Sequence, residues 1–353
     1  MIPRRPGEVT ASWLREMLPD GVAVTDVEVV AVRDATNCNA SLRLTHDDPA
    51  LPHAMFLKLP PLDPDRRARL DWQSMARREV RFYRDLAHRL DLVVPEVYVA
   101  ALDDETGDFL LLMEDLEASG HELPDPDAGL DPQRVRRALA GFAALHARYE
   151  DAGRRQAEAG WLTPSGRTSD YGARLLREGI DSGAALGSAF VAVAERYIAD
   201  RDLLQDAWEL GPTTVLHGDA HLGNVYVPSG HEGGLGLFDW GLMTVGSPLR
   251  DVSYFITMVL SPDNRRAHER DLLAAYLEAR RRAGASEIDE ATAWRWHRLQ
   301  SAYTVVASCQ TIVLPDDAGP ERRRFAEAFL HRAASAVDDL DAPDAIDAHA
   351  ASR

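Results

Sequence analysis

An eight-residue run in the second half of the chain carries the clearest chemical signal in the sequence. It reads His-Gly-Asp-Ala-His-Leu-Gly-Asn over residues 217–224, and Asp239 follows fifteen residues after its last member. An aspartate, an oxygen ligand five residues later and a second aspartate beyond a hairpin are what metal-assisted phosphoryl transfer needs. Asp219 is the candidate catalytic base for an acceptor hydroxyl. Asn224 and Asp239 are the candidate Mg²⁺ ligands, because hard cations prefer oxygen.

The only lysine of the chain gives a second signal. Among 39 basic residues Lys58 alone is a lysine, and it lies inside the apolar run 54–60. An ammonium buried there needs an anionic partner. Glu79 is the candidate, because it projects from the apolar face of a predicted helix, where a carboxylate also needs a partner. A strand lysine paired with a helix glutamate positions nucleotide phosphates in kinases. The alternative is a solvated edge lysine and a surface glutamate.

The central run also permits other interpretations. His217, Asp219 and His221 alternate, so on a strand they would face one side and could hold a hydrolytic metal ion. That interpretation leaves Lys58 and Asn224 without a role, and no further histidine cluster completes the site. A further alternative is that the run is only a polar turn between strands. The match of several positions to one reaction would then be a coincidence. If phosphoryl transfer is correct, the two histidines orient the loop through hydrogen bonds.

The composition bounds the partners and the compartment. The chain has 353 residues, of which 45% are apolar, and 57 acidic residues give a formal charge of −18. This charge disfavours nucleic acid and anionic membranes as partners. Cys38 and Cys309 support neither a disulfide framework nor a cysteine zinc site. Without a signal-peptide pattern or an apolar run near the roughly 20 residues that span a bilayer, we expect a cytoplasmic protein.

Two kinds of periodicity divide the chain. Up to Met113 the pattern is strand-rich, with one long helical stretch over about 65–90 and a hairpin turn at 103–107. From Asp131, an N-cap followed by proline, helical spacing dominates. Strands are expected over 24–32, 42–44, 55–59, 97–102 and 109–113, and short ones around residues 214–238. The predicted fold class is α+β, with an antiparallel sheet and one main helix followed by a larger, mostly helical part.

With these motifs the chain resembles the aminoglycoside phosphotransferase and choline kinase-like superfamily of small-molecule kinases. The His-Gly-Asp-x-His-x-x-Asn block carries the resemblance, which extends to about residue 260. It implies a bilobal, protein-kinase-like fold, with a nucleotide-binding N-lobe at 1–115 and a C-lobe at 116–353. The C-lobe would hold the catalytic loop, the metal site and the acceptor pocket. Independently of the resemblance, the acidic, alanine-rich composition from about residue 336 indicates a frayed tail. Mg²⁺ and ATP are the implied cofactors, with GTP as the other donor.

The resemblance also assigns a loop and a hinge around the nucleotide. Residues 34–41 match the loop that covers the phosphates, although this loop lacks the glycine that many relatives have. The candidate contacts in it are Thr36, Asn39 and Ser41. The hinge would lie at 113–116, where backbone groups of Glu114 and Leu116 would pair with the purine edge.

Other positions support the scaffold and narrow the substrate. Asp251 matches a structural aspartate behind the catalytic loop, and His146 is interpreted as a packed helix histidine. Trp240 follows the metal aspartate where protein kinases have phenylalanine, which argues against a protein substrate. The acceptor pocket would lie between the catalytic loop and helices at about 155–210 and 255–335.

Three hypotheses follow for the function. The first is transfer of the γ-phosphoryl group of a nucleoside triphosphate to a hydroxyl of a small antibiotic or other natural product, giving resistance or self-protection. The second is a housekeeping kinase for choline, a sugar or another metabolite. Aromatic residues at 294, 296, 297 and 303 could cage a quaternary ammonium, although packing in a core is the commoner role. The third is a catalytically silent nucleotide-binding regulator.

Overall fold

The computed structural model describes the chain apart from residues 20–21, 70–71, 165, 167–168, 231–232 and 316–317. The chain divides into two compact units. The first comprises residues 1–123, 226–232 and 236–243, and the second comprises 124–225, 233–235 and 244–353. The boundary between the two lobes, predicted between residues 115 and 116, stays a prediction.

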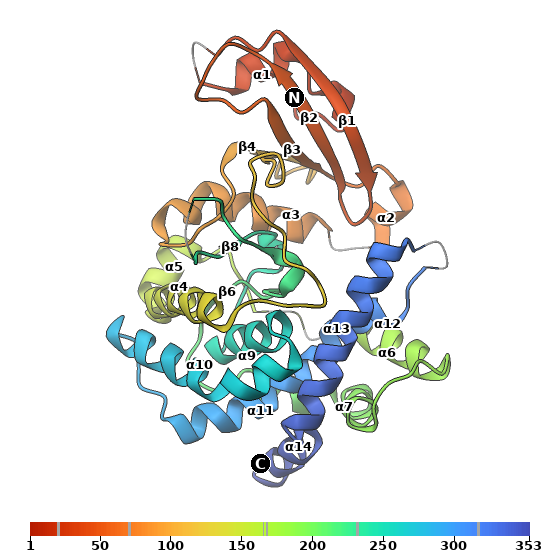
Figure 1. The fold of residues 1–353 in the computed structure, drawn as a ribbon, viewed down its shortest axis with the longest axis vertical. Helices are drawn as coiled ribbons and strands as arrows, with labels where there is room; N and C mark the ends of the chain where they lie inside the picture. Colours follow the sequence, from red (N-terminus) through yellow and green to blue (C-terminus); the bar gives the residue numbers. More distant parts are fainter. Residues whose placement is uncertain (20–21, 70–71, 165, 167–168, 231–232, 316–317) are drawn as a thin grey trace. The chain divides into compact units, whose positions relative to one another are not determined.

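A five-stranded antiparallel sheet forms the centre of the first unit (Figure 1). Its strand order is β1-β2-β3-β5-β4. The expected hairpin between the last two strands is present, with Gly107 at a φ of 74°, a conformation that glycine adopts without strain. The predicted sheet is therefore confirmed. Its strands are β1 (Asp26–Asp34), β2 (Cys38–Thr45), β3 (Ala54–Leu59), β4 (Val97–Leu102) and β5 (Phe109–Glu114).

The alternation of side chains separates the two faces of this sheet. On one face, apolar residues of β2 and β3 pack with Leu14 of α1 (Ala11–Met17) and with Leu18 in a buried core. On the other face, Asn39 of β2 lies directly opposite Lys58 of β3. The side-chain period of two thus keeps Lys58 out of the apolar core.

The helical stretch predicted over about 65–90 is confirmed for the described residues, but its helical pitch changes along the stretch. It consists of α2 (Pro64–Arg69), α3 (Trp72–Arg81), a π-helical turn (Phe82–Leu86) and a 3₁₀ turn (Ala87–Arg89), and residues 70–71 lie outside the described part. In the wide π turn, Phe82, Tyr83 and Leu86 are all buried. Phe82 stacks on Trp240, with ring centroids 3.8 Å apart. Packing onto this tryptophan accompanies the change of helical pitch.

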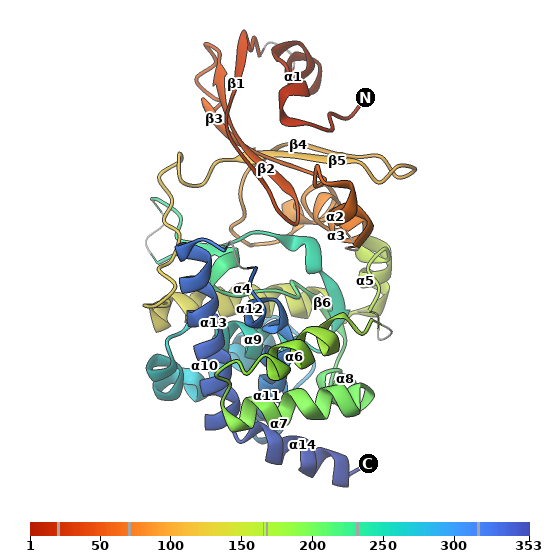
Figure 2. The ribbon, with the colours of Figure 1, turned by 90° about the vertical axis from the view of Figure 1, so that its right-hand side faces the viewer.

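The second unit is mostly helical. Its first helix begins as predicted, because the Asp131 carboxylate accepts hydrogen bonds from two backbone N–H groups of the first turn. Figure 2 shows α14 running beside α7, and residues of both helices belong to the same buried cluster. The helices are α4 (Pro132–Glu150), α5 (Ala152–Ala159), α6 (Tyr171–Asp181), α7 (Ser188–Ala199), α8 (Arg201–Trp208), α9 (Pro248–Val259), α10 (Pro262–Arg282), α11 (Glu290–Ala307), α12 (Cys309–Ile312), α13 (Pro320–Asp339) and α14 (Ala342–Ala351).

The tail from about residue 336 is not frayed, so that expectation is wrong. It completes α13 and forms α14, where Ala342, Ala345 and Ile346 join the main buried cluster of the unit. The small alanine side chains allow the helices to approach each other closely. The acidic, alanine-rich composition of the tail alone does not show that it packs in this way. None of the described helices is both long enough and apolar enough to cross a bilayer.

Short strands frame the central sequence run. β6 (Thr214–Leu216) leads into residues 217–224 and pairs with β9 (Thr244–Gly246). β7 (Val225–Tyr226) follows the run and pairs with β8 (Gly236–Leu237). Strands were expected in this region, and their pairing holds both ends of the run.

Candidate active site

The lysine of the chain lies between two carboxylates in the first unit. Lys58 Nζ donates to Glu79 Oε2 at 2.6 Å and to Asp239 Oδ1 at 3.2 Å. The side chains of Lys58 and Glu79 are 8% and 4% exposed, whereas that of Asp239 is 42% exposed. The strand, the helix and the segment after β8 therefore bring together three of the residues singled out in the sequence. The buried carboxylate fixes the ammonium, and the exposed one meets solvent.

Charge and burial compete in this cluster. Burial alone would lower the pKa of Lys58, but the carboxylates of Asp239 and Glu79 outweigh it and hold the pKa above its ordinary value. Burial raises the pKa of Glu79, and the Lys58 ammonium opposes that rise. A buried ion pair of this kind contributes little net stability, yet loss of one partner is costly. Its value lies in the fixed position of the ammonium.

Backbone geometry sets the direction of Asp239. Its φ of 60° and ψ of 67° lie in the left-handed region, which aspartate tolerates better than most residues. The next residue, Trp240, is fully buried against Phe82. The anchored indole thus holds a strained backbone position, and such positions are frequent at functional sites.

The predicted loop residues lie on the hairpin between β1 and β2. Asn39, across from Lys58, has a buried Oδ1 with no hydrogen-bond partner among the described residues. Ser41 lies two residues further along the same face, opposite Phe56. Thr36 is exposed in the turn itself. Asn39 is therefore the loop candidate that lies nearest to Lys58 in the strand register.

The predicted hinge continues from β5. The Glu114 N–H donates to the Glu96 carbonyl, and the Glu114 carboxylate contacts His121 Nε2 at 2.9 Å. The Leu116 carbonyl accepts from the His121 N–H. Neither of these hydrogen bonds involves the N–H of Leu116. They therefore leave that N–H available for the predicted pairing with a purine.

Asp219 and Asn224 lie together in the second unit. Asn224 Nδ2 donates to the Asp219 carbonyl at 2.9 Å and to its Oδ2 at 3.1 Å. The hydroxyl of Tyr254 in α9 donates to the other carboxylate oxygen, Oδ1, at 3.2 Å. The Asp219 side chain remains 25% exposed. Two donors thus orient a carboxylate that still reaches solvent.

Asp251 holds the start of the loop at residues 217–224. Its carboxylate accepts from the N–H of His217 at 2.6 Å and of Gly218 at 2.9 Å. Gly218 has a φ of 83°, which favours glycine at this turn. Burial would raise the pKa of Asp251, but His146 and the loop groups hold it below its ordinary value. The carboxylate therefore remains an acceptor for the loop.

The two loop histidines form hydrogen bonds within the loop. His217 Nδ1 accepts from the Asp219 N–H, and His221 Nδ1 accepts from the Gly223 N–H. In the described part of the chain, no group of three His, Cys, Asp or Glu side chains is arranged to hold a metal ion. The alternative of a three-ligand hydrolytic centre is not supported.

The structure also identifies a residue that sequence reasoning missed. Burial, followed by the charge of Asp219, raises the pKa of Tyr254 well above its ordinary value, so its hydroxyl keeps its proton and donates. The available signal was the spacing, because Tyr254 follows Asp251 by three residues on one helix. Two residues that are three positions apart on a helix lie next to each other on its surface.

Of the four aromatic residues of α11, Trp294 and His297 contact each other, with ring centroids 5.4 Å apart, and all four also pack against other parts of the unit. His297 is fully buried and bonds to Ser253, and the ring of Trp294 is covered by Arg270 at 3.6 Å. Trp296 packs against the core, whereas Tyr303 contacts helix α9. This arrangement matches packing and not one aromatic cage.

Comparison with known families identifies the class of protein. Residues 25–287 match the phosphotransferase enzyme family, known as APH, so the chain belongs to this family. It is a phosphotransferase that acts on small molecules, and the predicted enzyme class is confirmed. No curated protein matches the chain.

Solved structures share the fold at low sequence identity. A protein of Ralstonia eutropha, described as a candidate aminoglycoside phosphotransferase, has 16% identity and a TM-score of 0.55, with 93% of this chain and 97% of that chain covered. Aminoglycoside 2'-phosphotransferase-IIIa in complex with GDP has 12% identity and a TM-score of 0.54, with the same coverage. An ethanolamine kinase of Plasmodium vivax has 10% identity and a TM-score of 0.50, with 89% and 81% covered. The predicted kinase-like fold is thereby confirmed.

Proposed function

We propose that the protein transfers the γ-phosphoryl group of a nucleoside triphosphate to a hydroxyl of a small natural product, such as an antibiotic. The observation that carries the proposal is the Lys58 ammonium bonded to both Glu79 and Asp239. A fixed cation beside an exposed carboxylate suits the phosphates of a nucleotide and its metal ion. Asn39 would add a polar contact from the strand opposite Lys58.

Asp219 is proposed as the catalytic base. Its carboxylate would accept the proton of the acceptor hydroxyl as the oxygen bonds to phosphorus and the nucleoside diphosphate leaves. Tyr254 and Asn224 each donate to one carboxylate oxygen, which restricts its orientation. Positioning of this kind provides much of the catalysis in phosphoryl transfer.

The two predicted metal ligands carry donor atoms of the kind that a magnesium ion binds. Nδ2 of Asn224 is occupied by Asp219, which leaves its Oδ1 as the neutral ligand, and Asp239 provides an anionic oxygen. Oxygen donors are those that Mg²⁺ prefers. Asn224 and Asp239 would hold the ion, which when bound neutralises charge on the phosphates. ATP is the proposed donor, and GTP is tested beside it because one solved relative is a GDP complex.

Mass spectrometry tests the proposal. The protein is incubated with Mg²⁺, ATP or GTP, and a panel of hydroxylated antibiotics and metabolites. We expect one acceptor to gain the mass of a phosphoryl group, and Asp219→Ala to abolish the gain. A gain only on choline, ethanolamine or a sugar would favour the metabolite kinase, while nucleotide binding with no gain on any acceptor would favour a regulator.

A further inference from the structure

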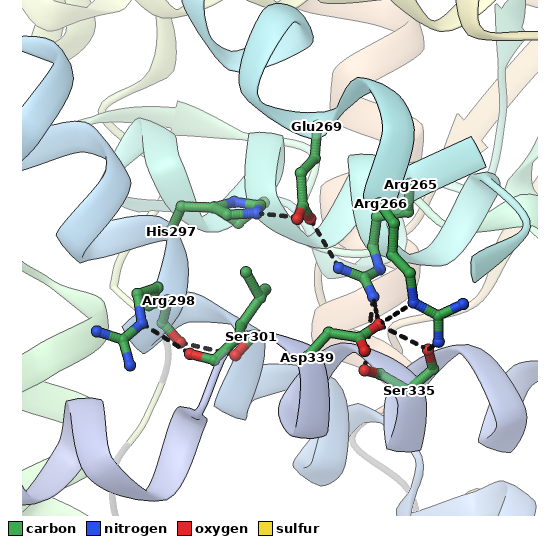
Figure 3. Close-up of polar contacts among 10 residues, drawn as sticks. Arg265, Arg266, Glu269, His297, Arg298, Ser301, Ser335 and Asp339 are labelled. Atoms are coloured by element: carbon green, nitrogen blue, oxygen red, sulfur yellow. Dashed lines mark hydrogen bonds and ion pairs between the residues drawn. The ribbon is translucent and has the colours of Figure 1, made fainter. Parts of the chain in front are cut away.

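Buried arginines in the second unit are matched with acceptors. Arg265, 1% exposed, pairs with Glu269 at 2.8 Å and with Asp339 (Figure 3). Arg280, equally buried, pairs with Glu150. Such pairing is expected, because an uncompensated buried charge is costly.

Arg332, 4% exposed, has no carboxylate partner among the described residues but donates to the carbonyls of Leu260 and Ala328. Arg250 has neither a carboxylate nor a carbonyl partner among them. It lies half-buried in the first turn of α9, where its Nη2 donates to the Tyr303 hydroxyl at 3.1 Å and its guanidinium lies 4.4 Å from the centre of that ring. Its Nε is buried without a hydrogen-bond partner, and it forms no ion pair with any residue that the structure describes. The charges of Asp251 and exposed Glu209 act on it, but Asp251 is bonded to the catalytic loop.

The position of Arg250 links it to the catalytic loop. Arg250 and Tyr254 are one turn apart on the same side of α9, and both contact the ring of Tyr303. Tyr254 in turn donates to Asp219. The guanidinium is therefore joined to the proposed base by two aromatic side chains.

Aromatic rings also surround His221, whose Nε2 lies 3.5 Å from the Asp219 carboxylate. His221 packs edge-on against Tyr254 and Phe329, with centroid separations of 6.4 and 5.3 Å, and lies 5.9 Å from Phe325. An acceptor that places its hydroxyl at Asp219 would find apolar surfaces beside it. Of the two charged residues of α9, Asp251 is bonded to the loop backbone, and Arg250 has no carboxylate partner among the described residues.

We infer that Arg250 binds an oxyanion of the acceptor, so that the acceptor is a hydroxylated organic acid carrying a carboxylate or a phosphate. The inference rests on the proposed function and narrows its substrate class. A guanidinium offers several N–H donors in one plane, which match the two oxygens of such a group. A polycationic acceptor would instead meet repulsion at this residue.

Matched acceptors test the inference. They are 4-(hydroxymethyl)benzoate, its methyl ester, 4-(hydroxymethyl)benzylamine and 4-(hydroxymethyl)phenyl phosphate, with the last separating phosphate from carboxylate. We expect the two anions to have higher kcat/KM than the ester and the amine. Arg250→Met should raise KM for the preferred anion on the order of 10- to 100-fold, with kcat little changed, and Arg250→Lys should recover part of it. The ester should respond to neither variant.

Arg281→Met is the matched control, because Arg281 is an exposed arginine paired with Glu278 on the surface. It should leave all four acceptors unaffected. Equal kcat/KM for the acid and its ester, preference for the amine, or the same kinetics in Arg250→Met and Arg281→Met would overturn the inference.

A binding experiment separates this inference from the proposed reaction. Calorimetry with 4-methylbenzoate and with 4-methylphenyl phosphate, which have no acceptor hydroxyl, requires no transfer. Binding to the wild type that is lost in Arg250→Met supports the anion site even if no acceptor is phosphorylated, in which case the proposed function alone fails. Binding that persists in Arg250→Met, or no binding of either anion to the wild type, overturns the site even if transfer is observed.

Discussion

The hydroxyl of Tyr254 offers a sharp test of how the carboxylate of the proposed base, Asp219, is held. Tyr254→Phe removes the donor 3.2 Å from Asp219 Oδ1 while keeping the ring that packs edge-on against Tyr303. A hydrogen bond to a charged group contributes roughly 1.5–3 kcal/mol. Because Asp219 is 25% exposed and Asn224 still donates to its other oxygen, water can replace part of this. We therefore expect the low end of the range, a loss in kcat on the order of tenfold.

The assay measures kcat at saturating nucleotide and acceptor, nucleotide affinity by calorimetry, and unfolding in urea. Affinity should stay at the wild-type value, and the free energy of unfolding should fall by no more than about 1 kcal/mol. Tyr197→Phe is the control, because Tyr197 lies on α7, where it packs in the helical core and stacks on Trp208. A wild-type kcat in Tyr254→Phe, or an equal loss in Tyr197→Phe, would refute the reasoning.

Three further predictions concern buried charge and thiols. Lys58→Met should abolish detectable binding of the Mg²⁺–nucleotide complex in calorimetry and, because Glu79 is left unpaired, lower the free energy of unfolding by about 3 kcal/mol. The double variant Lys58→Met with Glu79→Gln should recover part of that stability but none of the binding. Equal stability of the two variants would contradict the ion pair. Arg280→Met should lower the urea midpoint because its carboxylate partner is stranded, whereas Arg250→Met should leave it unchanged or raised; the reverse order would contradict the assignment of partners. Burial raises the pKa of Cys309 to about 11 and that of Cys38 above its usual value. Neither thiol of the native protein should therefore react with iodoacetamide at pH 8, and reactivity should grow only as the pH approaches 11. Alkylation of the native protein at pH 8, measured by intact mass, would contradict this prediction.

The sheet and the charged pair could be predicted because local periodicity determines them. The apolar run at 54–60 indicated β3, and the structure then shows Lys58 on the face away from the apolar core. Helical spacing placed Glu79 on the inward side of α3, and the structure joins the two at 2.6 Å. Each charge was conspicuous because it stood in an apolar pattern, and two such charges require each other.

The parts that were missed depend on tertiary contacts. The pitch change at Phe82 accompanies stacking on Trp240, which is far away in sequence. The tail appeared too polar to pack, yet Ala342 and Ile346 are buried in the helical core. Arg250 could not be distinguished from the other arginines, because its lack of a carboxylate partner becomes visible only after folding.

Asp219→Asn provides the most direct test of the central claim, which is that Asp219 is the base in phosphoryl transfer. The substitution keeps the size of the side chain and removes its ability to accept a proton. We would measure phosphoryl transfer to the preferred acceptor by mass spectrometry and nucleotide affinity by calorimetry on the same preparation. The account predicts that transfer falls by at least about 100-fold with affinity within a few-fold of the wild type. Transfer at the wild-type rate, or a parallel loss of affinity and transfer, would contradict it.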